Sequence, residues 1–111
     1  MVRHESVFMI LNTAVTGDGE PLVLIHGLFG AARNLGILTR ALSQDARVVA
    51  MDLRNHGESP HGLPMDFATM AQDVAETLAS LGIERANVCG HSLGGKTAMA
   101  LALALADRYS A

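Results

Sequence analysis

The chain has 111 residues, half of them hydrophobic, and a formal net charge of −3 at pH 7. This length and composition fit a single small domain, residues 1–111, with a hydrophobic core, and exclude an intrinsically disordered tail. Acidic and basic residues are interspersed without a basic stripe, which argues against nucleic-acid and anionic-membrane partners.

The N-terminal part of the chain predicts two strands. Residues 6–15 are rich in Val, Phe, Ile and Thr, which favour strands. Residues 22–25 form a continuous apolar run, as expected of a strand that is buried on both faces. The turn-forming residues 16–21 between them predict a hairpin. The second strand runs into a glycine-rich loop, residues 26–30.

The next segment is expected to alternate a helix with a strand. Apolar residues at helical spacing predict a helix over residues 31–42. Residues 47–51 predict another buried strand, which is closed by Asp52. The connection that follows, residues 53–64, has no periodicity and is expected to be a loop.

A second helix and a third strand–helix unit complete the chain. Asp66 is a suitable N-cap, residues 67–81 carry an apolar stripe at helical spacing, and Gly82 ends that helix. Val88 lies in a third buried strand. Residues 93–108 predict a last helix that is apolar nearly all round, as in a helix packed deep against a sheet.

This order of elements predicts the α/β fold class, with a mostly parallel sheet and helices on both faces. In such sheets, functional loops collect at the C-terminal ends of the strands. Three loops are expected there, residues 27–30, 52–59 and 90–94. We therefore expect these loops to converge on one edge of the sheet.

Residues 90–94 carry the most specific motif. A short strand runs into Gly-His-Ser-Leu-Gly and then into a helix, as in a nucleophile elbow, where a serine occupies a sharp, strained turn. Gly90 and Gly94 suit this turn because the strand and helix backbones pass closely there. Ser92 is therefore the candidate nucleophile, and it needs a general base to attack an ester.

Two backbone amides near this serine are candidates for an oxyanion hole. The N–H of Leu93, at the start of the last helix, points toward developing negative charge, which the helix dipole also favours. A second N–H is expected from Leu28, in the loop after the first buried strand. Within that loop, His26 and Gly27 are expected to support the amide, with His26 as a brace.

The other polar residues are interpreted as structural. His91 flanks the serine, but neighbours across a sharp turn diverge, so it is expected to support the elbow and not to accept the serine proton. His4, His56 and His61 are expected to be solvated or structural. No histidine pair has metal-ligand spacing, so neither a metal nor another cofactor is expected. The loop after the second buried strand is expected to be held by mutual ion pairs among Asp52, Arg54 and Glu58.

Targeting signals are sparse. The first ten residues lack the apolar core and cleavage site of a signal peptide. The longest apolar run, residues 98–106, is too short to span a bilayer, so no membrane partner is expected. Cys89, the single cysteine, is expected to be a buried structural thiol in a reducing compartment. These features predict a cytoplasmic location, with an organelle matrix as the alternative.

A second motif overlaps the elbow. Residues 90–97, GHSLGGKT, also satisfy the phosphate-loop pattern of nucleotide triphosphatases. A phosphate loop swings wide to surround a phosphate, whereas an elbow turns tightly to expose one side chain. The phosphate loop also usually opens its domain, while two strand–helix units precede this motif. Nucleotide binding through Lys96 therefore stays as an alternative function.

Residues 26–30 (HGLFG), 52–60 (DLRNHGESP) and 90–99 (GHSLGGKTAM) together resemble the α/β-hydrolase superfamily, most of all a branch of small esterases in bacteria and mitochondria. The likeness runs over roughly residues 12–109. It implies that Ser92 is the nucleophile and that the two amides named above form the oxyanion hole. The implied reaction is hydrolysis of a small carboxylic ester, or of an acyl thioester, through an acyl-enzyme without a cofactor.

The resemblance also implies that the chain is a partial domain. Family members continue with further strands, a cap, an acid and a histidine, and the triad order Ser, acid, His places both partners beyond Ala111. We therefore expect the N-terminal half of the fold, from a truncated gene product, a gene-model fragment or a deliberately shortened chain, with no activity by itself.

A partial domain is expected to expose one edge of its sheet. The elbow strand would then lack a neighbour beside a very apolar last helix. Self-association, aggregation or complementation by a C-terminal fragment is the expected result. A non-catalytic module that pairs with a full-length hydrolase is the remaining alternative.

Overall fold

The computed structural model describes residues 8–28 and 30–110. The elements in chain order are β1 (Thr13–Thr16), β2 (Pro21–Ile25), the 3₁₀ turn η1 (Ala32–Leu35), α1 (Gly36–Leu42), β3 (Arg47–Met51), α2 (Phe67–Ser80), β4 (Ala86–Gly90), α3 (Leu93–Ala104) and β5 (Tyr109–Ser110). The strands form one sheet in the order β1-β3-β2-β4-β5. Strand β1 is antiparallel to β3 and the other pairs are parallel, which confirms the predicted mostly parallel sheet.

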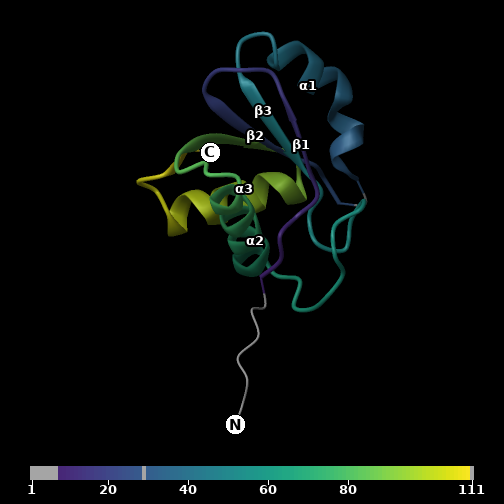
Figure 1. Ribbon diagram of the computed structural model, residues 1–111. Helices are drawn as coiled ribbons and strands as arrows, with labels where there is room; N and C mark the ends of the chain where they lie inside the picture. Colours follow the sequence, from purple (N-terminus) through teal and green to yellow (C-terminus); the bar gives the residue numbers. More distant parts are fainter. Residues whose placement is uncertain (1–7, 29, 111) are drawn as a thin grey trace.

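Helices cover both faces of this sheet (Figure 1). Helix α1 and η1 lie on the face where Leu24, Val48 and Ala50 are buried, while α2 and α3 pack over a larger core on the other face. Successive side chains of a strand point to opposite faces, so Leu24 faces α1 whereas Val23 and Ile25 face the larger core. Strands β2 and β3 are thus buried on both sides, which explains their continuous apolar runs.

The predicted hairpin between the first two strands is wrong. Strand β1 pairs with β3, with Thr13 opposite Met51, and not with β2. The connecting turn crosses the start of β3, where the Arg47 N–H donates to the Glu20 carbonyl (3.1 Å). Gly17 in this turn has φ of +86°, and a Cβ there would collide with carbonyl oxygens of the α1–β3 connection. This tight turn places β1 on the outer side of β3.

The first strand is also shorter than predicted. Residues 8–12 lie outside the sheet, and the first two residues of the expected strand lie outside the described residues. The Met9 N–H donates to Asp73 Oδ1 and the Leu11 N–H to Thr77 Oγ1, both at 2.8 Å. Because these amides bond to side chains of α2, they are not available to a neighbouring strand.

The predicted helices form with small changes at their ends. The first one begins as η1, and α1 starts only at Gly36. Helix α2 is capped as expected, because the Asp66 side chain accepts a hydrogen bond from the Thr69 N–H (2.7 Å). Gly82 follows its end with φ of +73°. The buried stripe of α2 includes Met70, Ala71, Val74 and Leu78, whereas Phe67 is exposed.

The C-terminal end departs from the prediction. Helix α3 ends at Ala104 and does not reach Arg108, and the chain then forms β5. Strand β5 pairs with the start of β4, with Ala86 opposite Tyr109. The expectation that β4 is a bare edge is therefore wrong at its start. Residues 88–90 have no partner strand on that side within the described part of the chain.

Helix α3 and strand β4 each leave one face uncovered. Met99 and Leu103 are 55% and 87% exposed, so α3 is not buried all round as expected. Cys89 is exposed and is not the buried thiol predicted from the sequence. The reason is the alternation along β4: Val88 faces the core under α2 and α3, while Asn87 and Cys89 point to the other face, where α1 packs over β2 and β3.

Candidate active site

Ser92 lies on a two-residue turn between β4 and α3. Strand β4 ends at Gly90 and α3 begins at Leu93, so only His91 and Ser92 connect them. A hydrogen bond from the Gly94 N–H to the His91 carbonyl closes the turn (3.0 Å). Ser92 has φ of 55° and ψ of −111°, a strained conformation for a residue with a Cβ. The connection is thus a sharp strand-to-helix turn.

Glycine is required at two positions around this turn. A Cβ on Gly90 would collide with the Gly94 carbonyl, and a Cβ on Gly94 would collide with the Ile25 carbonyl at the end of β2. The strand, the turn and the helix can approach this closely only because both residues lack side chains. The start of α3 is therefore packed against the end of β2, where the loop of residues 26–30 begins.

Ser92 opens onto two hollows at the C-terminal rim, the edge of the sheet where β2, β3 and β4 end. One hollow, of about 480 Å³, is lined by the loop after β2, by Asn34 and Leu35 of η1, and by His91 and Ser92. The other, of about 580 Å³, is mostly apolar and is lined by β4 and by α3 as far as Met99. The Ser92 side chain is exposed and forms no hydrogen bond within the described part of the chain.

His26 lies buried beneath the C-terminal rim, with 1% of its surface exposed. Its Nδ1 lies 2.7 Å from the Gly27 carbonyl oxygen, and its Nε2 accepts a hydrogen bond from the Leu53 N–H (2.9 Å). Burial lowers the pKa of His26 below its usual 6.5, against the hydrogen bond to Gly27, and the neighbouring His56 lowers it further. The ring joins the loop after β2 to the loop after β3.

The two candidate amides belong to the same rim. Leu93 is the first residue of α3, so its N–H has no partner within the helix. Leu28 lines the same hollow as Ser92. His91 lines it too, with Nδ1 2.8 Å from where a Cβ on Gly27 would lie. No hydrogen bond joins the His91 ring to Ser92, both of which the structure describes.

The ion pairing expected among Asp52, Arg54 and Glu58 is wrong. Asp52 accepts hydrogen bonds from neutral donors: the Ala32 N–H (2.7 Å), the Asn12 side-chain amide (2.9 Å) and the Glu58 N–H (3.0 Å). Burial raises the pKa of Asp52, but these bonds outweigh burial and hold it below its usual 3.8. Asp52 therefore joins the N-terminal segment and η1 to the loop after β3.

Arg54 pairs with Asp73 of α2, and both side chains are fully buried. The Arg54 Nε donates to Asp73 Oδ2 (2.6 Å), Nη2 donates to Oδ1 (2.8 Å), and Nη1 donates to the Pro64 carbonyl (2.8 Å). The hydrogen bonds that Arg54 donates to Asp73 raise the pKa of Arg54 above its usual value. Sequence reasoning missed this pair because its members are 19 positions apart. The one signal for this pair in the sequence was the charged Asp73 next to the apolar stripe of α2.

A phosphate loop does not form at residues 90–97. The two-residue connection between β4 and α3 leaves no loop wide enough to surround a phosphate. The Lys96 Nζ lies 5.9 Å from the centre of the Phe67 ring, and the buried Thr97 hydroxyl donates to the Leu93 carbonyl (2.9 Å). The geometry therefore does not support the nucleotide-binding alternative.

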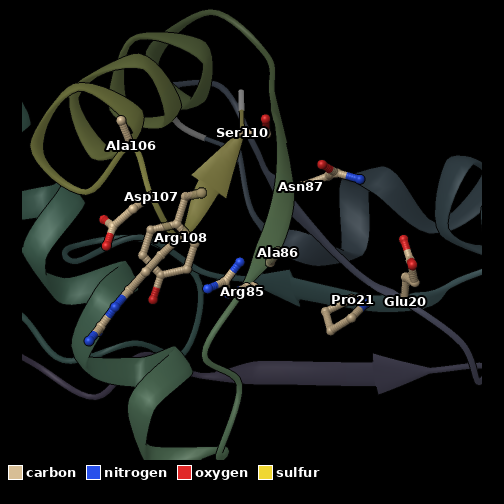
Figure 2. A pocket seen from close by; sticks show the side chains of 10 residues that line it. Glu20, Pro21, Arg85, Ala86, Asn87, Ala106, Asp107, Arg108 and Ser110 are labelled. Carbon is tan, nitrogen blue, oxygen red and sulfur yellow. The ribbon is translucent and has the colours of Figure 1, made fainter.

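A further pocket, of about 380 Å³, lies at the opposite end of the strands (Figure 2). Glu20 and Pro21 at the start of β2, and Arg85 and Ala86 at the start of β4, contribute to its lining. Ligand sites of parallel α/β sheets form at the C-terminal ends of the strands. This pocket is therefore not part of the candidate site.

The described residues were also compared with the requirements of a metal site and of a membrane-spanning helix. Among the residues that the structure describes, no three His, Cys, Asp or Glu side chains are grouped as metal ligands. Over the same residues, no helix combines the length and the apolar character needed to cross a membrane.

Comparisons with known sequences identify relatives. The sequence model of the family described as alpha/beta hydrolase fold matches residues 20–110. Over 91 residues the chain is 46% identical to "Esterase YbfF" of Escherichia coli strain K12, covering 82% of this chain and 36% of that protein. Over 87 residues it is 47% identical to "sn-1-specific diacylglycerol lipase ABHD11" of Xenopus laevis, covering 77% of this chain and 28% of that protein.

A comparison with solved structures gives the same result. The structure described as "Marine microorganism esterase" matches with a TM-score of 0.89 and 39% sequence identity, over 91% of this chain and 39% of that one. The chain thus spans about a third of the length of the curated relatives it matches. Both its sequence and its fold show that this chain belongs to the α/β-hydrolase family, with esterases and a lipase among its relatives.

Proposed function

We propose that this chain carries the nucleophile of a serine hydrolase that acts on small carboxylic esters or acyl thioesters, and that Ser92 is this nucleophile. The observation that carries the proposal is the φ of 55° at Ser92, on a two-residue turn at the C-terminal rim. A residue with a Cβ keeps such a conformation only where its surroundings impose it, and such strain collects at active sites. Ser92 is exposed, as expected of a nucleophile that a substrate has to reach.

The N–H groups of Leu28 and Leu93 are proposed to bind the oxyanion of the tetrahedral intermediate. The start of α3 favours negative charge, and Leu28 lines the hollow that Ser92 shares. Each such donor contributes about 3–4 kcal/mol to transition-state stabilisation. The residues proposed to support these groups are Gly90, His91 and Gly94 at the elbow and His26 and Gly27 in the loop after β2.

In the proposed reaction, Ser92 Oγ attacks the ester carbonyl while a base removes its proton. The alcohol then leaves, and water hydrolyses the acyl-enzyme. We propose that the base and its orienting acid come from outside residues 1–111, which then form a partial domain. Two facts support this: the chain spans about a third of its relatives, and the triad order in this fold is Ser, acid, His.

Acetylation by p-nitrophenyl acetate tests the proposal on the chain as it is. Without a base the attack is slow and stops after one acyl group, so peptide mass spectrometry is the suitable measurement. Because each oxyanion donor is worth a factor on the order of 100 or more, Ser92 should react at least about 100-fold faster than Ser43 and Ser110. Ser92→Ala should remove the fast label and leave the other two serines unchanged. Equal labelling of all three serines would refute Ser92 as the nucleophile.

A further inference from the structure

The Gly27 carbonyl at the C-terminal rim has two hydrogen-bond partners. The His26 Nδ1 lies 2.7 Å from its oxygen, and the Gly30 N–H donates to it at 3.0 Å. A carbonyl oxygen can only accept, so Nδ1 must carry a proton. The Gly27 oxygen is therefore held toward the His26 ring.

The other nitrogen of the same ring is also fixed. The His26 Nε2 accepts from the Leu53 N–H at 2.9 Å, so it carries no proton. The two bonds together select the neutral tautomer with the proton on Nδ1. Burial favours the neutral ring, and His56, whose ring centre lies 4.9 Å away, opposes a second charge. The carboxylate of Asp52 acts in the opposite direction and more weakly.

The direction of the Gly27 carbonyl determines the direction of the Leu28 N–H. The peptide bond between them is trans, so its C=O and N–H point in opposite directions within one plane. With the oxygen turned toward His26, the N–H is turned to the other side of the loop. A flip of this single peptide would present a carbonyl oxygen where the proposed oxyanion hole needs a donor.

We propose that His26 is a positioning residue for the oxyanion hole: with its proton on Nδ1, it holds the Gly27 carbonyl and thereby directs the Leu28 N–H toward Ser92. The inference rests on the proposed function of Ser92 and Leu28. His26 does not touch the substrate and acts through one peptide group. Through Leu53, the same ring makes this orientation depend on the loop after β3.

Two isosteric variants separate the roles of the two ring nitrogens. In His26→Asn the amide can replace the Nδ1 donor, whereas in His26→Gln it reaches the Nε2 position and can accept from the Leu53 N–H. We expect Ser92 acetylation by p-nitrophenyl acetate to stay within about threefold in His26→Asn and to fall about 100-fold in His26→Gln, the effect of losing one oxyanion donor. Circular dichroism checks that both variants are folded, and equal rates in the two would overturn the proposal.

NMR on the unsubstituted chain tests the inference independently of Ser92 chemistry. The ring nitrogen shifts of His26 should report a protonated Nδ1 and a free Nε2 at neutral pH. Residual dipolar couplings should orient the Leu28 N–H toward Ser92. A proton on Nε2, or an N–H directed away from Ser92, would overturn the proposal. If Ser92 is not labelled while the tautomer and orientation are as expected, the proposed nucleophile is refuted and the positioning of Leu28 is supported.

Discussion

Ser92 keeps its positive φ because the backbones on either side of it are packed closely. Gly94 is pressed against the Ile25 carbonyl, and Gly90 against the carbonyl of Gly94. A side chain at either glycine would push strand and helix apart and relax the turn between them. The orientation of the candidate nucleophile therefore depends on two residues that have no side chain.

Gly94→Ala should destabilise the chain by about 2–3 kcal/mol, because its Cβ meets backbone atoms that cannot rotate away. Urea unfolding measures this change, and Ser92 acetylation should be lost with it. Gly36→Ala is the matched control, since a Cβ there meets nothing within 4 Å and Gly36 is helical. This control should change stability by about 1 kcal/mol or less, in the stabilising direction. A Gly94→Ala chain as stable as the parent would contradict the packing argument.

The free energy of unfolding should decrease in two steps as the pH is lowered. His26 has a folded pKa below 6.5, so its contribution is complete above pH 6.5 and is lost as the pH falls below that value, where the unfolded chain takes up the proton first. Asp52 has a folded pKa below 3.8, so its contribution is complete above pH 3.8 and is lost as the pH falls through the folded pKa. Urea unfolding at a series of pH values measures both. His26→Asn should remove the upper step alone, and an upper step that survives this change would contradict the assignment.

Among the elements, α2 holds the loop after β3 and the N-terminal segment in place. Asp73 accepts from Arg54 of the loop and from the Met9 N–H of the segment. The same loop carries Leu53, whose N–H bonds to His26. The buried Asp73 carboxylate is therefore connected to the candidate site: it binds the loop after β3, and that loop is hydrogen-bonded through the His26 ring to the loop after β2.

Asp73→Asn should destabilise the chain by about 3–5 kcal/mol, because it leaves the buried Arg54 guanidinium without its counter-charge. Glu76→Gln is the control on the same helix, since Glu76 is exposed and bonds only loosely to Gln72 (3.4 Å). Its effect should stay below about 1 kcal/mol. Chemical denaturation of both variants decides the matter, and similar losses in the two would count against a special role for the buried pair.

At the scale of the whole molecule, the outer side of β4 and one face of α3 are left uncovered by the described residues. Residues 88–90 lack a partner strand on one side within the described ranges. Met99, which lines one hollow with these residues, and Leu103, four positions further along α3, are exposed. Unpaired strand groups next to apolar side chains favour association. The proposed pairing with another copy, or with a complementing fragment, belongs to this surface.

Leu103→Lys should therefore weaken self-association of the chain, because it places a charge on that surface. Ile37→Lys is the matched control, as Ile37 on α1 is 85% exposed and Leu103 on α3 is 87% exposed. Sedimentation velocity over a range of concentrations measures the association of both variants. A monomeric parent chain, or equal effects of the two substitutions, would speak against this surface.

The isolated chain should show no turnover of p-nitrophenyl butyrate above a buffer control. Loss of the histidine base in a serine triad lowers turnover by a factor on the order of 10⁶. Steady-state kinetics with Ser92→Ala as the comparison measures this. Turnover that disappears in Ser92→Ala would show that a base comes from this chain or from a second copy, and would refute the proposal that it lies elsewhere.

The sequence by itself determined the features that depend on neighbouring residues. The elbow was predictable because a strand, two spaced glycines, a serine and a helix follow one another within ten positions. The cap at Asp66 was predictable because its partner is Thr69, three positions on. The parallel sheet was predictable from apolar runs such as residues 48–51, because a continuous apolar run is typical of a strand that is buried on both faces.

Only the tertiary structure decided the features that join distant residues. The pairing of β1 with β3, the buried Arg54–Asp73 pair and the exposure of Cys89 each depend on which element lies beside which. The proton on His26 Nδ1 depends on Gly27 and on Leu53, which is 27 positions away. Local sequence sets what a segment prefers, whereas its burial and its hydrogen-bond partners are set by the segments that pack against it.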